Sequence, residues 1–206
     1  MTARYRNLVF TPSVKATQER NGSRNAYAHD DDGADADVLT AREAEFIASR
    51  DSFYMATVGA GGWPYVQHRG GPAGFVKVLG PRTLGFADFR GNRQYVSVGN
   101  FADDGRASLF FMDYARRARL KVLGRARVVE PGGAKDIAKA LALPGYDAKI
   151  ERALLIEIEA FDWNCPQHIT PRFSLTEIAP TIDLLKSRVA ELEAELTTLK
   201  SVQLQQ

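Results

Sequence analysis

The residues between 53 and 129 constrain the fold most, because they form short extended segments separated by turn residues. Extended segments are predicted at 53–58, 64–69, 76–79, 83–87, 107–114 and 118–129, with another at 153–161. Glycine, proline and aspartate between them mark tight turns. Several short strands at this spacing are typical of an antiparallel barrel rather than of alternating strands and helices. The predicted fold class is mainly β with peripheral helices.

Helices are predicted around this β region. Thr40 followed by Glu43 is a capping-box pair, and it predicts a short helix that ends near Asp51. Apolar residues at a spacing of three to four predict a second helix over 131–146. Residues 90–101 alternate less and are expected to include a helical turn.

The end of the chain carries the clearest periodicity. Apolar residues there alternate in steps of three and four, at Ile182, Leu185, Val189, Leu192, Leu196 and Leu199. Such a seam favours a helix that pairs with a partner chain, and packing on its own domain is the alternative. Pro180 is predicted in the first turn of this helix. Three parts are therefore expected: a polar, acidic N-terminal arm (1–38), a barrel (39–176) and an amphipathic, coiled-coil-like helix (177–206).

Composition excludes several classes of protein. A net charge of +2 argues against a dedicated nucleic-acid partner, and the single cysteine, Cys165, excludes a disulfide framework or a multi-cysteine metal site. The three histidines are scattered, so no metal site is predicted. No apolar run is long enough to span a membrane or to act as a signal peptide, so we expect a cytoplasmic protein. The acidic residues 30–37 are expected to lie in a solvated arm, or in one that wraps a partner subunit.

Two segments carry residues suited to a phosphate ester. The first, Tyr65–Pro72 (YVQHRGGP), follows the turn Gly59–Gly62 and forms the second half of a predicted hairpin. The second is Phe86–Gln94 (FADFRGNRQ). Both place arginine and glycine beside an extended run. Guanidinium groups and closely approaching backbone N–H groups are the donors that phosphate oxygens need.

Together with Phe161–Phe173 (FDWNCPQHITPRF), these segments resemble the pyridoxamine 5'-phosphate oxidase-like family of FMN-binding split β-barrels. The third segment resembles the C-terminal motif of an uncharacterised, FMN-dependent branch, and the resemblance covers Glu43 to Phe173. It implies an FMN cofactor held between the subunits of a homodimer. It also implies an oxidoreductase that acts on a small-molecule substrate or a nicotinamide donor. Gly70 and Gly71 replace the family's more usual aliphatic run ending in lysine, so pyridoxamine phosphate is not the expected substrate.

The resemblance also implies roles for individual residues. The flavin would be lined by Val66, Gln67, His68, Arg69, Gly70 and Gly71, and the ribityl chain would be approached by Ala87 and Asp88. The phosphate would be held by Arg69, Gly91, Asn92, Arg93 and Gln94. Trp163 of the partner subunit would cover the ring, and the partner subunit's Gln167 or His168 would donate near its N1–O2 edge. Each residue has an ordinary structural alternative: a solvated arginine, a hydrogen-bonded histidine, a turn-forming aspartate or a core tryptophan.

No catalytic residue is assigned by the sequence. The leading hypothesis is an FMN-dependent oxidoreductase, in which the flavin carries the redox chemistry. The alternatives are a non-catalytic module that binds or senses FMN or another flat cofactor, and a structural dimer with an empty cleft.

Overall fold

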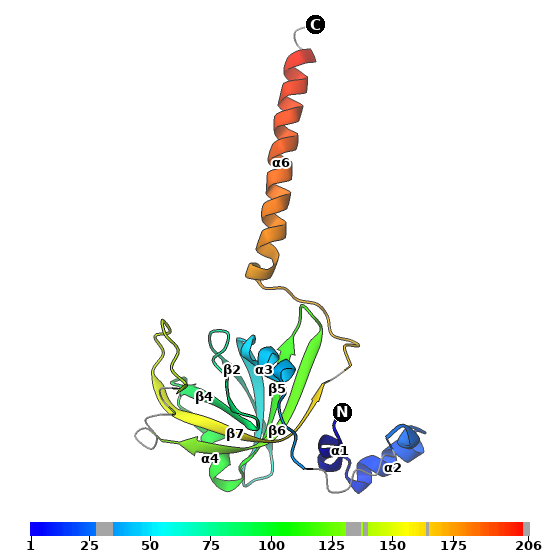
Figure 1. Ribbon diagram of the computed structural model, residues 1–206, viewed down its shortest axis with the longest axis vertical. Coiled ribbons are helices and arrows are strands. Elements are labelled where there is room, and N and C mark those ends of the chain that lie inside the picture. The colour runs from blue at the N-terminus through cyan, green and yellow to red at the C-terminus, as the bar shows by residue number, and fades with distance from the viewer. Residues whose placement is uncertain (28–34, 131–136, 138–139, 164, 204–206) are drawn as a thin grey trace. The chain divides into compact units, whose positions relative to one another are not determined.

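The computed structural model describes residues 1–27, 35–130, 137, 140–163 and 165–203 (Figure 1). Within these residues, seven strands form one antiparallel sheet in the order β2-β1-β5-β6-β7-β4-β3. The strands are β1 (Ser52–Val58), β2 (Pro64–Gly70), β3 (Lys77–Gly80), β4 (Thr83–Phe89), β5 (Arg106–Asp113), β6 (Ala118–Val129) and β7 (Ile150–Trp163). The helices are α1 (Ala3–Val9), α2 (Pro12–Arg20), the 3-10 turn η1 (Arg24–Tyr27), α3 (Ala41–Ala48), α4 (Val96–Asp103) and α6 (Leu175–Gln203).

The described chain divides into two compact units. One holds residues 1–113 and 118–167, and the other holds residues 114–117 and the chain from His168 onward. The first contains the whole sheet and the second contains α6.

Aromatic contacts show that the sheet curls into a barrel. Phe53 on β1 stacks on Phe111 of the neighbouring β5, with ring centroids 5.0 Å apart. The same ring meets Phe86 edge-on at 5.2 Å, although Phe86 lies on β4, four positions along the sheet. In a flat sheet these strands would be roughly 19 Å apart. The inner faces of the two halves therefore meet around one core.

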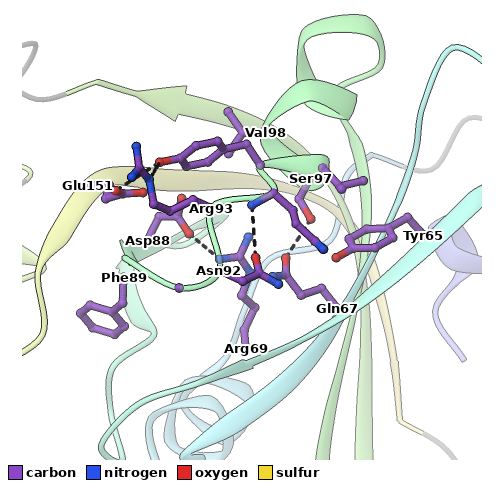
Figure 2. Close-up of a pocket in the computed structure, with 14 residues that line it drawn as sticks. Tyr65, Gln67, Arg69, Asp88, Phe89, Asn92, Arg93, Ser97, Val98 and Glu151 are labelled. Atoms are coloured by element: carbon purple, nitrogen blue, oxygen red, sulfur yellow. Dashed lines mark hydrogen bonds and ion pairs between the residues drawn. The ribbon is translucent and has the colours of Figure 1, made fainter.

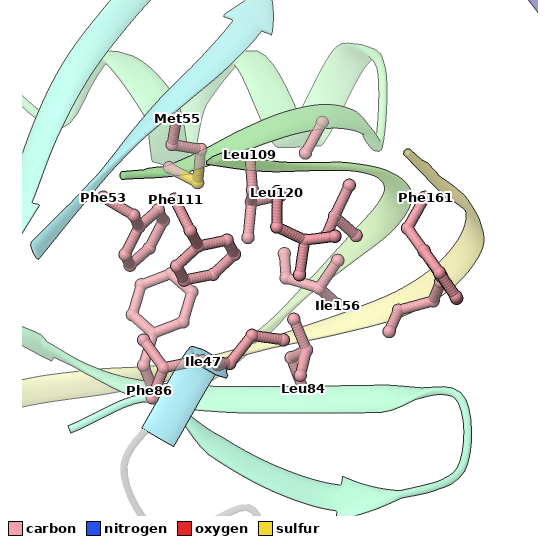
Figure 3. Close-up of a cluster of buried hydrophobic side chains, with 14 of the residues drawn as sticks. Ile47, Phe53, Met55, Leu84, Phe86, Leu109, Phe111, Leu120, Ile156 and Phe161 are labelled. Atoms are coloured by element: carbon pink, nitrogen blue, oxygen red, sulfur yellow. The ribbon is translucent and has the colours of Figure 1, made fainter. Parts of the chain in front are cut away.

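Figure 3 shows this core filled from both halves of the sheet and from α3. Its fully buried members include Ile47, Phe53, Met55, Leu84, Phe86, Leu109, Phe111, Leu120 and Ile156. Along β5 the buried residues alternate with less buried ones, as expected for a strand with one face on the core. The predicted mainly β split barrel with peripheral helices is confirmed.

The predicted local structure agrees closely with the observed elements. β6 has the predicted bounds, and β7 is the strand that extends furthest beyond its prediction, to Ile150–Trp163. The predicted hairpin is present, with Gly62 N–H donating to Gly59 C=O at 2.9 Å in the turn between β1 and β2. The helical turn expected within 90–101 is α4.

The capping box of α3 is also confirmed. The backbone N–H of Thr40 donates to the Glu43 carboxylate at 3.1 Å, and the helix ends at Ala48. Of the helix predicted over 131–146, residues 131–136 and 138–139 lie outside the described residues. Ile137 and Ala140 are helical, and Leu141 N–H donates to Ile137 C=O at 3.0 Å.

The first residues of the chain differ from a solvated arm. Arg4 on α1 pairs with Glu159 of β7 at 2.8 Å, and the terminal amino group of Met1 lies 3.2 Å from Asp162. Tyr5 is buried. Carboxylates on β7 thus hold the basic start of the chain against the barrel unit. Most of the acidic run, residues 30–34, lies outside the described residues.

Helix α6 begins earlier than predicted, which corrects the position of Pro180. Ser174 N–H donates to the Glu177 carboxylate at 2.7 Å, and Glu177 N–H donates to the Ser174 hydroxyl at 3.2 Å. This reciprocal cap starts the helix at Leu175, so Pro180 lies inside it and not in its first turn. A proline is compatible with the first turn of a helix, but the cap formed by Ser174 and Glu177 determines where this one begins.

Candidate functional site

A pocket of about 180 Å³ opens between β2, the end of β4 and the start of α4 (Figure 2). The loop that joins β4 to α4 forms much of its wall. The lining residues are Tyr65, Gln67, Arg69, Asp88, Phe89, Gly91, Asn92, Arg93, Gln94, Tyr95, Val96, Ser97, Val98 and Glu151. The two segments singled out in the sequence, 65–72 and 86–94, therefore meet at one place.

Strand alternation decides which residues of β2 face this pocket. Tyr65, Gln67 and Arg69 line it, whereas Val66 is 60% exposed on the other face. His68 is also exposed and meets its cross-strand neighbour Tyr54 edge-on, with ring centroids 5.6 Å apart.

A second pocket of about 230 Å³ adjoins the first and shares four of its residues, Gln67, Arg69, Phe89 and Gly91. His68, Gly70 and Ala87 line this second pocket. Gly71 lines neither pocket and lies against Phe75, whose ring a Cβ at this position would meet at 2.8 Å. Of the predicted run from Val66 to Gly71, the four central residues line one pocket or the other.

Asp88 is a buried carboxylate between two arginines. One of its oxygens accepts a short hydrogen bond from Arg69 Nη1, and the other lies 3.2 Å from Arg152 Nη1. The three side chains come from β4, β2 and β7, respectively. Both oxygens of Asp88 thus hold arginines.

Sequence reasoning missed Arg152, although it lies directly opposite Asp88 in the β4–β7 register. Burial opposes the charge of Arg152, but the carboxylates of Glu130 and Asp88 outweigh burial and raise its pKa. Its guanidinium also lies 4.9 Å from the centre of the Tyr95 ring. Only the pairing of the two strands could have identified this residue.

The loop before α4 is held in an unusual conformation. Arg93 and Tyr95 have φ angles of 62° and 54°, in the left-handed region that bulky residues rarely adopt. Arg93 Nε donates to the Tyr95 hydroxyl at 3.3 Å, and that hydroxyl donates to Glu151 at 3.3 Å. A hydrogen bond from Arg90 is the main cause of the lowered pKa of Glu151. Strained residues held by such a network are typical of ligand-binding loops.

Helix α4 begins at this loop without a side-chain cap. Its N-cap, Tyr95, makes no capping hydrogen bond through its side chain. Ser97, in the first turn, donates to the amide oxygen of Gln67 at 3.1 Å and so fixes that amide in the pocket wall. The N-terminus of a helix favours a negatively charged group.

Two further observations fit a bound phosphate ester. Arg69 Nε is buried and has no hydrogen-bond partner among the described residues. A Cβ added at Gly91 would meet no described atom within 4 Å, so the pocket is open at this point of its wall. Gly91, Asn92, Arg93 and Gln94 are all exposed. The site therefore combines buried and exposed guanidinium donors with backbone that a ligand can approach.

The third predicted cluster does not join this pocket within the first unit. Trp163 Nε1 donates to Glu43 at 2.6 Å, and the indole meets the Phe46 ring edge-on at 4.7 Å. Trp163 and Gln167 are not among the residues that line either pocket. His168 belongs to the second unit, where it is exposed and has a φ of 61°.

Among the residues that the structure describes, no group of three or more histidine, cysteine, aspartate or glutamate side chains could hold a metal ion. In the same part of the chain, every helix is too short or too polar to cross a membrane.

Several solved structures are similar to this chain. HupZ of Group A Streptococcus is 16% identical, with a TM-score of 0.47, and the match covers 66% of this chain and 100% of that one. A general stress protein 26-related protein of Clostridium acetobutylicum is 17% identical, covering 66% and 94% (TM-score 0.45). An FMN-binding protein of Syntrophomonas wolfei is 17% identical, covering 60% and 88% (TM-score 0.45). No curated protein matches the sequence.

The family model described as pyridoxamine 5'-phosphate oxidase matches residues 39–163, which is more than half of the sequence. The matched range runs from the residue before the α3 cap to the end of β7, and it includes every strand of the barrel and both segments of the pocket. The chain therefore belongs to the pyridoxamine 5'-phosphate oxidase family.

Proposed function

We propose that this protein binds FMN at the pocket between β2, β4 and α4, and that it is an FMN-dependent oxidoreductase acting on a small molecule. The observation that carries the proposal is the buried Arg69 Nε without a hydrogen-bond partner among the described residues, in a wall that Gly91 leaves open. Membership of the family supports the choice of a flavin.

The phosphate of FMN would be held by Arg69 and Arg93, with the amides of Asn92 and Gln94 as neutral donors. Asp88 holds one end of the Arg69 guanidinium, which fixes the direction of its remaining N–H groups. Arg93 is exposed and can turn toward a ligand at little cost in desolvation. Two arginines and the uncapped start of α4 together suit a doubly charged phosphate group.

The bound flavin would supply hydride and electron transfer, and the protein would orient it and shield one face. Gln67, fixed by Ser97, is placed to hydrogen-bond a polar ligand edge. The second pocket has Phe75, Phe86 and Phe89 among its lining residues, and it would receive the aromatic ring of the flavin.

We further propose that the functional unit is a homodimer with FMN at the subunit interface. The β1–β2 hairpin, which lines the pocket with Tyr65 and Gln67, exposes three large apolar residues. Tyr54 is 41% exposed, Val66 60% and Trp63 84%. Exposed apolar residues gathered on one hairpin are typical of an interaction surface.

The first experiment is an absorption spectrum of the purified protein, with any released chromophore identified by mass so that FMN, a deazaflavin and haem are distinguished. FMN and riboflavin are then titrated into flavin-free protein and followed by flavin fluorescence. We expect FMN to bind more tightly than riboflavin, because only FMN carries the phosphate. A colourless protein that gains no flavin bands on addition of FMN would refute the proposal.

Variants locate the phosphate site. Arg93→Gln should weaken FMN binding roughly ten- to hundredfold, since it removes a hydrogen bond between charged groups, and should leave riboflavin binding unchanged. Arg127→Gln is the matched control, because Arg127 is exposed on β6 and does not line the pocket. Anaerobic bleaching of bound FMN by a nicotinamide donor or a small-molecule substrate tests turnover. Bound FMN that no donor bleaches would favour the non-catalytic flavin-binding module.

A further inference from the structure

Helix α6 carries an exposed apolar stripe along one face. Its members are between 37% and 65% exposed, and they are Ile182, Leu185, Val189, Leu192, Leu196 and Leu199. Because steps of three and four residues alternate, they occupy the a and d positions of successive heptads. Part of the stripe borders a shallow groove of about 330 Å³, together with Lys186 and Glu193. Such a groove on a helix is suited to the side chains of another helix.

We propose that this stripe binds α6 of a second copy of the chain in a parallel, two-stranded coiled coil. The a positions are Ile182, Val189 and Leu196, so two of the three carry a β-branched residue. The d positions are all leucine: Leu185, Leu192 and Leu199. β-Branched residues at a with leucine at d favour two parallel strands over larger bundles. The residue types on the stripe therefore favour one partner, an identical helix running in the same direction.

The charges beside the stripe suit the same arrangement. In a parallel coil each g residue lies near the e residue of the next heptad on the other helix. Arg188 at g would lie near Glu193 of the partner subunit, and Glu195 at g would lie near Lys200 of the partner subunit. Both pairs are attractive, and two-fold symmetry repeats each of them. No like charges meet at these positions.

Two features of the helix itself are compatible with the coil. Arg188 pairs with Glu191 of its own helix at 2.8 Å, but both side chains are exposed, so the pair is weak and leaves Arg188 able to turn to a partner. Pro180 precedes the first heptad residue, Ile182, so its missing N–H falls outside the seam. Fewer than three heptads form a marginal coil alone. The test therefore uses the full chain.

Disulfide cross-linking reports the helix pairing directly, whether or not the barrels also associate. Cys165→Ser removes the single native thiol, and Leu199→Cys is then added at a d position. In a parallel coil the two introduced thiols lie within reach of a disulfide. In an antiparallel coil position 199 would lie opposite position 182, and the two thiols would be roughly 25 Å apart. Ser201→Cys, on the outer face of the same helix, is the matched control.

We expect Leu199→Cys to cross-link at least ten times faster than Ser201→Cys under mild oxidation. Val189→Asp added to the Leu199→Cys chain should abolish that difference, whereas Leu184→Asp, at an exposed position off the stripe, should preserve it. Equal and slow cross-linking at positions 199 and 201 would overturn the proposal. So would a cross-link that forms only when Ile182→Cys and Leu199→Cys chains are mixed, since that pairing is antiparallel. Far-UV circular dichroism checks that each variant keeps its sheet.

Discussion

Arg69 and Asp88 form an ion pair between strands that are not neighbours in the sheet. β2 is the first strand in the sheet order and β4 is the sixth, yet the guanidinium of one holds the carboxylate of the other. The pair therefore connects the two ends of the sheet where the barrel closes, at the pocket proposed for FMN. Arg152 of β7 adds a second cation to the same carboxylate.

Replacing the Asp88 carboxylate tests how much its ion pairs with Arg69 and Arg152 contribute to the stability of the fold. Asp88→Asn leaves two largely buried arginines without their shared counter-charge, and it should lower the free energy of unfolding by about 3 kcal/mol. Urea denaturation followed by circular dichroism measures the change. Asp104→Asn is the control, because Asp104 pairs with the exposed Arg106, and it should change little. Equal midpoints for the two variants would show that the Asp88 pair does not stabilise the fold.

A substitution at Gly91 is expected to change FMN binding without changing the stability of the fold. A Cβ at this position meets no described atom within 4 Å, so Gly91→Ala should leave the unfolding midpoint nearly unchanged. The added methyl group would project at the pocket wall and should weaken FMN binding, measured by fluorescence titration. Gly99→Ala is the control: Gly99 is also open to a Cβ but lies within α4 and does not line the pocket. Equal FMN affinities in both variants would argue against close approach of the ligand to Gly91.

Arg93 combines a charged side chain with a left-handed backbone, and two replacements separate these properties. Arg93→Asn and Arg93→Gln both remove the charge and should weaken FMN binding equally. Asparagine tolerates a φ of 62° better than glutamine does, so the asparagine variant should melt at the higher temperature. Thermal unfolding without ligand, compared with FMN titration, provides both measurements. If the two variants melt together, the backbone at Arg93 is not strained.

Glu43 is expected to make stability depend on pH. Burial opposes its charge, but hydrogen bonds from Thr40 and Trp163 outweigh burial and lower its pKa below the ordinary 4.5. A carboxyl group whose pKa is lowered on folding stabilises the fold above its unfolded pKa, and this contribution is lost as the pH falls through the folded value. Stability should therefore decrease below about pH 4.5, the ordinary value for this group.

Glu43→Gln should flatten this part of the pH profile, as measured by urea denaturation between pH 3 and 7 with tryptophan fluorescence. The indole of Trp163 reports the site directly, because it donates to Glu43. Glu45→Gln, exposed on the same helix, should retain the wild-type profile. If the free energy of unfolding of the Glu43→Gln variant depends on pH as it does in the wild type, other groups govern the loss of stability in acid.

The sequence by itself determined the local features of this protein. Turn residues and alternation are read over a few neighbours, so the strands, the Gly59–Gly62 hairpin and the cap at Thr40 could all be predicted. The heptad pattern of α6 is equally local, although the helix begins at Leu175, before the predicted 177. The candidate cationic loop, with Arg93 and its glycine, was also visible as a motif.

Only the tertiary structure decided which distant residues meet. The closure of the barrel places Arg69 beside Asp88, and the register of β4 with β7 adds Arg152. Alternation along β2 has two possible phases, and the register of β2 with β1 sets the observed one. Gln67 and Arg69 lie opposite the buried Met55 and Phe53, and they line the pocket, whereas Val66 is exposed. Within its own chain, Trp163 contacts α3 through an indole hydrogen bond to Glu43 and an edge-on contact with Phe46. These outcomes depend on contacts between segments far apart in the sequence, which no local pattern specifies.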